Sequence, residues 1–187
     1  TLQDALDLGH EIRKISDIPL ILFSYLNPLL SKGKSLFPEI KKGGFDGVLI
    51  VDLPFEESSS MTLDICAAGL DPIFILTPST SRERALKIVN SAQGLIYYVC
   101  QKGTTGIREA LPKDFENNIL KIKSMTELPL LAGFGISNFE SAKGALDYAD
   151  GFVVGSAIVK MIEEDKTPSD IKVFAQTIDP RKVTWNP

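Results

Sequence analysis

The sequence has 187 residues, of which 44% are hydrophobic and 24% are charged, and its net charge is -4. These values are typical of one soluble globular domain, and they exclude a disordered chain, which would hold far fewer apolar residues. The acidic balance, with a pI near 5.1, argues against nucleic-acid binding through bulk positive charge. Because a closed (β/α)₈ barrel needs about 250 residues, a chain of this length is too short to close one.

Signals for membrane insertion, export and disulfide bonding are weak. The longest apolar run, near Pro19–Phe23, is far shorter than the roughly 20 residues that a membrane-spanning helix needs. The first residues lack the basic and apolar regions of a signal peptide. Cys66 and Cys100 lie in separate apolar runs, which predicts buried thiols rather than a disulfide or a metal site. We therefore expect a cytoplasmic protein that binds no metal, membrane or nucleic acid.

Six short apolar runs, rich in β-branched residues, recur along the chain. None of them alternates apolar with polar residues, which is typical of parallel strands covered on both faces. The predicted strands are Pro19–Phe23, Gly47–Val51, Pro72–Leu76, Leu95–Val99, Pro129–Ala132 and Gly151–Val154.

Helix signals lie before, between and after these strands. This alternation predicts an α/β fold of six βα units around a parallel sheet, either open or barrel-shaped. We expect one domain over residues 1–187, with residues 183–187 as a tail. In chain order the signals are a helix at about Leu2–Lys14, a C-cap at Gly69, capping boxes at Thr80–Glu83 and Ser137–Glu140, an N-cap at Thr167 before Pro168, and a helix near Ser169–Thr177.

Functional groups in βα folds gather where the parallel strands end. The last two such loops, Gly133–Ser137 and Gly155–Ala157, place small residues between a strand and a helix start. Free backbone N–H groups at a helix N-terminus favour an anion, and glycine lets a phosphate approach the backbone. Because (β/α)₈ barrels commonly bind phosphate after their last two strands, these loops predict a phosphate site. The alternative for each loop is an ordinary tight turn.

Three further features have open interpretations. The loop Lys102–Gly106 is small and polar, so it could be a lid over the substrate or a solvated connector. Asp52 comes directly after the second predicted strand. Its side chain therefore either faces the site, caps a helix or forms a salt bridge with a basic residue. His10, the only histidine, is expected on a solvated helix face, and no nucleophilic triad can be assembled around it.

Five stretches of sequence occur together in one order. They are SYLNPLLSKG from Ser24, GVLIVDLPFEES from Gly47, PIFILTPSTSRERALKIVNSAQGLIYYVCQKGTTG from Pro72, GFGIS from Gly133 and ADGFVVGSAIVK from Ala149. Their combination resembles the α subunits of tryptophan synthase over nearly the whole chain up to about Lys160.

The resemblance implies a TIM (β/α)₈ barrel, of which six of the eight βα units are present and the first two are missing. It also implies a lyase of tryptophan biosynthesis that splits indole-3-glycerol phosphate into indole and glyceraldehyde 3-phosphate by a retro-aldol cleavage. The α subunit of that family carries no cofactor. It assembles as an α2β2 heterotetramer with a pyridoxal-phosphate β subunit, which receives the indole.

The resemblance assigns roles to matching positions. They fall into three groups, which bind the phosphate, line the substrate pocket and face the β subunit. The implied sets are Gly106, Gly135, Gly155 and Ser156 for the phosphate; Phe23, Val51, Ile75, Tyr97, the lid residue Thr105 and Phe134 for the pocket; and Asn27 and Pro54 for the β subunit.

Two departures from the family pattern leave alternatives open. The family's acid–base glutamate and aspartate, in its first two βα units, match no residue here, so they are expected before Thr1 and the chain as printed is expected to be inactive. The lid is altered, because Cys100-Gln101-Lys102 stands where the family has a serine, an arginine and a small residue. One alternative is a non-catalytic α subunit that activates the β subunit. Another is a phosphate-sugar barrel isomerase or epimerase.

Overall fold

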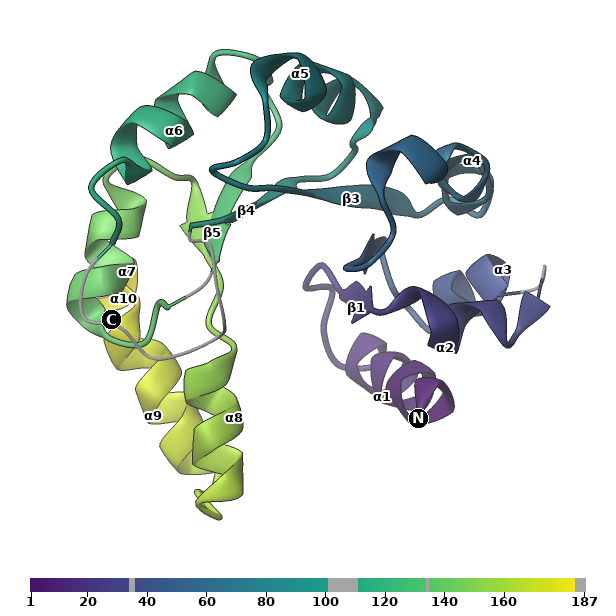
Figure 1. Cartoon of the computed structure of the whole chain (residues 1–187). Helices are drawn as coiled ribbons and strands as arrows, with labels where there is room; N and C mark the ends of the chain where they lie inside the picture. Colours follow the sequence, from purple (N-terminus) through teal and green to yellow (C-terminus); the bar gives the residue numbers. More distant parts are fainter. Residues whose placement is uncertain (34–35, 101–110, 134, 184–187) are drawn as a thin grey trace. The chain divides into compact units, whose positions relative to one another are not determined.

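The computed structural model describes residues 1–33, 36–100, 111–133 and 135–183, and its strands and helices alternate along the chain (Figure 1). The described elements are α1 (Leu2–Arg13), β1 (Ile21–Ser24), α2 (Leu26–Leu30), α3 (Leu36–Lys42), β2 (Gly47–Ile50), the 3₁₀ turn η2 (Phe55–Glu57), α4 (Ser59–Ala67), β3 (Asp71–Leu76), α5 (Arg82–Ser91), β4 (Ile96–Val99), α6 (Phe115–Lys123), β5 (Leu130–Gly133), α7 (Phe139–Leu146), β6 (Gly151–Phe152), α8 (Ser156–Glu163), α9 (Pro168–Ile178) and α10 (Pro180–Val183).

The chain forms two compact units. Unit 1 comprises Thr1–Ile75 and Leu86–Ile96, and unit 2 comprises the other described residues. Within unit 1 the strands are neighbours in the order β1-β2-β3, and both pairs are parallel. Within unit 2 the order is β4-β5-β6, with β5 and β6 parallel.

Unit 1 buries one face of its strands against helices. Leu22 of β1 pairs with Val48 of β2 in the parallel register, and both side chains are almost fully buried. They belong to one apolar cluster with residues of α1, α2, α3 and α4, such as Leu29 and Ile40, which are completely buried. Side chains of a strand alternate between its two faces. The residues directly before and after Leu22 and Val48 in their strands therefore lie on the opposite face.

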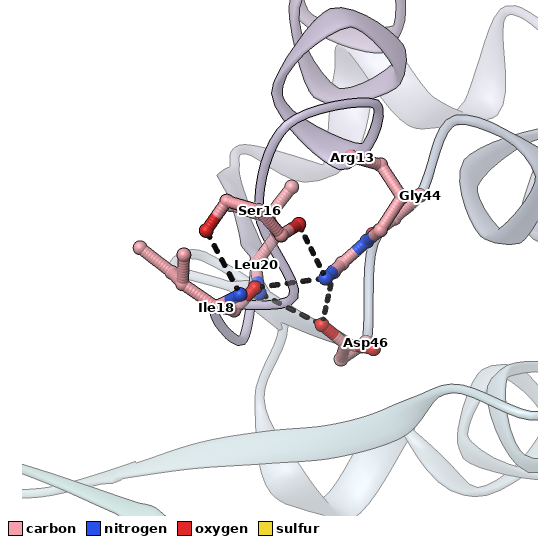
Figure 2. Close-up of polar contacts among 6 residues, drawn as sticks. All are labelled: Arg13, Ser16, Ile18, Leu20, Gly44 and Asp46. Carbon is pink, nitrogen blue, oxygen red and sulfur yellow. Dashed lines mark hydrogen bonds and ion pairs between the residues drawn. The ribbon is translucent and has the colours of Figure 1, made fainter.

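A guanidinium group fixes the strand starts of unit 1 (Figure 2). Arg13, the last residue of α1, donates to Gly44 O at 2.6 Å and to Asp46 Oδ2 at 2.6 Å, and also to Ile18 O at 3.0 Å. The same Asp46 oxygen accepts the backbone N–H of Leu20 at 2.8 Å. These bonds hold the end of α1, the entry to β1 and the entry to β2 together.

Unit 2 has its own core around β4, β5 and β6. Tyr98, Ile119 and Leu130 are completely buried, and the ring of Tyr98 lies 6.2 Å from that of Phe115 on α6. The backbone N–H of Cys100 donates to Gly133 O at 3.0 Å, which continues the bonding of β4 to β5 beyond the strand end. No described helix is long and apolar enough to cross a membrane.

All six predicted strands are confirmed, with ends that differ by at most two residues. The N-cap at Thr167 is confirmed, because its side chain accepts from Asp170 N and Pro168 opens α9. Gly69 follows the end of α4 with a φ of 75°, as expected after a helix C-terminus. The capping box predicted at Ser137–Glu140 is wrong by one residue: Asn138 is extended and accepts from Ser141 N at 2.8 Å, so α7 begins at Phe139.

Candidate active site

Three predicted pocket residues of unit 1 share one face of its strands. Phe23 pairs with Leu49, and Leu49 pairs with Ile73. Ile75 lies two residues after Ile73 in β3, and Val51 lies two residues after Leu49, just beyond the end of β2, where its N–H still bonds to Ser24 O at 2.9 Å. Both therefore point to the same side as Phe23. This side is opposite to the one that packs on the helices. Phe23 is 56% exposed, whereas Val51 and Ile75 are half-buried, so the three apolar side chains form a partly open wall.

Tyr97 supplies a half-buried phenol in unit 2. Its neighbour Tyr98 packs on α6, so Tyr97 points to the face away from that helix. Burial raises the pKa of the Tyr97 phenol above its ordinary value of 10.0, and a phenol is already neutral at physiological pH at that ordinary value. Gly133 makes room for it, because a Cβ at this position would collide with the Tyr97 ring and hydroxyl.

The two predicted phosphate loops follow neighbouring strands but differ at their helix starts. After β5, the side chain and backbone of Asn138 exchange hydrogen bonds with Ser141, so the start of α7 carries its own cap. After β6, Gly155 is the N-cap of α8, and no side chain of the described residues caps this helix. Gly155 and Ser156 are both exposed, and a Cβ at Gly155 would meet nothing within 4 Å. Among the described residues, the helix start without a side-chain cap is therefore that of α8, an arrangement that favours an anion.

The loop after β5 contains a residue with left-handed backbone conformation. Gly135 has a φ of 80°, a left-handed conformation that favours glycine. Two residues on, Ser137 Oγ is buried and has no hydrogen-bond partner among the described residues. Ser137 is the last residue of the predicted phosphate loop Gly133–Ser137. Thr105, Gly106 and Phe134, which the resemblance places in the site, lie outside the described residues, as do the lid segment 102–106 and residues 184–187 of the expected tail.

The two predicted interface residues, Asn27 on α2 and Pro54 before η2, are both exposed in unit 1. Asp52, two residues before Pro54, accepts through Oδ1 the backbone N–H of Leu26, the neighbour of Asn27 in the chain, at 2.7 Å. Of the three interpretations of Asp52, the structure therefore supports the helix cap. The described residues contain no group of His, Cys, Asp and Glu side chains that could hold a metal ion.

Comparison with known proteins decides the family. The family model for the tryptophan synthase alpha chain matches residues 1–183. The chain belongs to this family. It is 49% identical over 181 residues to the tryptophan synthase alpha chain of Chlamydia felis, covering 95% of this chain and 70% of the relative. It is 46% identical over 180 residues to that of Coxiella burnetii, covering 96% of this chain and 70% of the relative.

Solved tryptophan synthase structures confirm the fold. The chain superposes with a TM-score of 0.87 and 33% identity on a subunit of the tryptophan synthase a2b2 complex from Pyrococcus furiosus, covering 95% of this chain and 73% of that one. The six βα units therefore correspond to part of the (β/α)₈ barrel of that family. The known reaction of the tryptophan synthase alpha family is the retro-aldol cleavage of indole-3-glycerol phosphate, so the isomerase alternative is not supported.

Proposed function

We propose that the protein carrying this sequence is the α subunit of tryptophan synthase, and that the loops described here bind indole-3-glycerol phosphate for cleavage. The observation that supports this most directly is the start of α8, where Gly155 and Ser156 are exposed and none of the described side chains caps the helix. The first N–H groups of a helix have no partner within it, and the positive end of the helix dipole stabilises an anion there. The substrate's phosphate supplies that anion.

The proposed roles follow the two ends of the substrate. In unit 2, backbone groups and a hydroxyl are assigned to the phosphate and a phenol to the substrate pocket, and in unit 1 an apolar wall is assigned to the indole ring. The assignments are Gly106, Gly135, Gly155 and Ser156 for the phosphate, Phe23, Val51, Ile75 and Phe134 for the indole, Tyr97 for the lining of the substrate pocket and Thr105 for the lid.

These residues bind and orient the substrate. A retro-aldol cleavage removes a proton from a hydroxyl group while the departing carbon is protonated, so it needs a general base and a general acid. We assign neither role to a residue of this sequence, and we expect no turnover from these 187 residues alone. Binding of the phosphate end is expected to persist wherever unit 2 is folded.

We further propose that the protein works in the cytoplasm as part of an α2β2 assembly, without a cofactor of its own. The partner is a β subunit that holds pyridoxal phosphate and receives the indole. Two observations support this partner: the similarity to the a2b2 complex of Pyrococcus furiosus, and the exposure of both Asn27 and Pro54.

The test measures indole release from indole-3-glycerol phosphate by the intact protein and its Ser156→Ala variant. Losing a hydroxyl that donates to a charged phosphate is expected to raise KM about tenfold and to change kcat little. Ser60→Ala, an exposed serine on α4, is the matched control and should leave KM unchanged. Absence of indole release, together with stimulation of the β subunit, would instead favour the non-catalytic activator.

A further inference from the structure

We propose that Asp52 is a positioning residue that ties the loop after β1 to the loop after β2, so that Asn27 and Pro54 present one preformed surface to the β subunit. This inference rests on the proposed function for the identity of the partner. It adds a residue that makes the surface rigid, and it concerns contacts within unit 1 only.

The hydrogen bond made by Asp52 lies just beyond the last backbone hydrogen bond between β1 and β2. The last ladder bond between the two strands joins Val51 N to Ser24 O at 2.9 Å. The next connection is Asp52 Oδ1 to Leu26 N, at 2.7 Å. A side-chain carboxylate thus extends the pairing of β1 and β2 into the loops that follow them. Charge-assisted hydrogen bonds of this kind are among the stronger ones.

Asn27 lies on α2, and the first turn of this helix is capped by Asp52, a residue from another loop. Tyr25, the N-cap residue of α2, makes no side-chain capping bond. A helix of five residues is too short to be stable on its own. Two anchors hold it instead: Leu29, which is completely buried, and Asp52 at its first residue. Without Asp52 the buried Leu29 would still fix the middle of α2, while its first turn would lose its cap.

The segment that carries Pro54 is fixed independently. Glu57 N donates to Pro54 O at 3.0 Å, and Ser58, which is 3% exposed, donates through Oγ to Phe55 O at 2.7 Å. The ring of Phe55 packs edge-on against that of Phe74 at 5.5 Å. Asp52 therefore links α2 to a segment that is already rigid.

The residues around this link suit a protein partner. Tyr25 is 62% exposed and Leu30 is 58% exposed. Asn27, which lies between them in the sequence, is also exposed, as is Pro54 in the loop after β2. A partly apolar, partly polar surface held in one conformation binds more tightly than a mobile one, because less entropy is lost on association.

The test measures the Kd between the β subunit and the intact protein, its Asp52→Ala variant and its Asp52→Asn variant. Losing a helix N-cap costs about 1 kcal/mol, which corresponds to a Kd raised about fivefold if the bound state needs the cap. Asp52→Asn keeps an acceptor oxygen and should restore most of the affinity. Asp64→Ala, which removes an exposed carboxylate from α4 in the same unit, should leave Kd unchanged.

Two further measurements separate positioning from folding. Hydrogen exchange of the Leu26 amide should become faster in Asp52→Ala, while the unfolding temperature changes little. Leu26→Pro removes the donor instead of the acceptor, and the helix start tolerates it because Tyr25 is extended and proline suits the first helical position. It should raise Kd to a similar extent, and the double variant should be no weaker than either single one.

The outcomes are distinguishable. An unchanged Kd in Asp52→Ala, with faster exchange at Leu26, would overturn the positioning role and leave the proposed function standing. An equal rise in Asp64→Ala would also overturn it, because the effect would then reflect net charge. Failure of the unmodified protein to bind the β subunit would count against the proposed function itself, and the inference would fall with it.

Discussion

At the scale of single residues, Gly133 decides where the Tyr97 phenol can lie. It ends β5, and a Cβ added there would overlap the Tyr97 hydroxyl and ring. Gly155 is the opposite case, because the space beside it is open. One glycine is thus required by packing inside the protein. We propose that the other is required by the approach of a phosphate.

Gly133→Ala is therefore expected to destabilise the protein by about 2 kcal/mol, since overpacking of a filled site typically costs 1 to 3 kcal/mol. It should also raise KM, because the phenol must move. Gly155→Ala should leave the free energy of unfolding within about 0.5 kcal/mol and act on KM alone. Denaturant titration and steady-state kinetics check both. Equal stability of the two variants would contradict the packing role of Gly133.

At the scale of elements, the two units share a device that we call the strand-entry clamp. In each, the last residue of a helix is basic and bonds to an aspartate directly before a strand, and that aspartate accepts a backbone N–H where the neighbouring strand begins. In unit 1 the residues are Arg13, Asp46 and Leu20 (Figure 2). In unit 2 they are Lys123, Asp150 and Leu130.

Asp46→Ala is expected to lower the free energy of unfolding by about 2 kcal/mol, because it removes hydrogen bonds to a charged group and leaves the guanidinium of Arg13 without its carboxylate. The Arg13 side chain is 26% exposed, whereas the Lys123 side chain is 38% exposed. Asp150→Ala should therefore cost less, about 1 kcal/mol, as exposed ion pairs do. Denaturant titration measures both values, with Asp64→Ala as the control. An Asp46→Ala variant as stable as that control would refute the clamp.

The clamp of unit 2 also predicts a pH dependence. Burial disfavours the charged form of Asp150, but hydrogen bonds from Lys123 and Leu130 outweigh this, so the pKa of Asp150 lies below its ordinary value of 3.8. A lowered pKa in the folded state means that the stabilisation is fully present above the unfolded-state value. It is lost as the pH falls through the lower, folded-state pKa.

The stability difference between the protein and its Asp150→Asn variant should accordingly be constant above about pH 5 and shrink as the pH falls below the ordinary carboxyl range. Denaturant titrations of both proteins, from pH 6 down to the lowest pH at which they still fold, would measure this difference. A difference that grows on acidification would reverse the sign and refute the assignment.

The strands were predictable from the sequence because their signal is local. Runs such as Gly47–Val51 are continuously apolar and β-branched, and they are strands in the structure. The clamps and the cap at Asp52 were not predictable, because each joins residues 20 or more positions apart in the chain. The misplaced cap of α7 has a local cause: Ser137 and Asn138 are both good N-cap residues, and only the backbone geometry of Asn138 decides between them.

At the scale of the whole molecule, the two compact units either unfold together or open independently. Length and composition predicted one domain, while the contacts of the described residues gather in two compact units. The clamps offer local perturbations, one in each unit. Suitable reporters are the amides of Val51, bonded to Ser24 O at 2.9 Å, and Val153, bonded to Ala132 O at 2.8 Å.

Native-state hydrogen exchange of Asp46→Ala and Asp150→Ala, the two clamp variants, tests whether the units open independently. Units that open independently lose protection only where their own contacts are weakened. Asp46→Ala is therefore expected to speed exchange at Val51 and leave Val153 unchanged, while Asp150→Ala should do the reverse. Asp64→Ala should change neither amide. Faster exchange at both amides in either clamp variant would show that the units open together, as a single cooperative domain would, and would contradict independent opening.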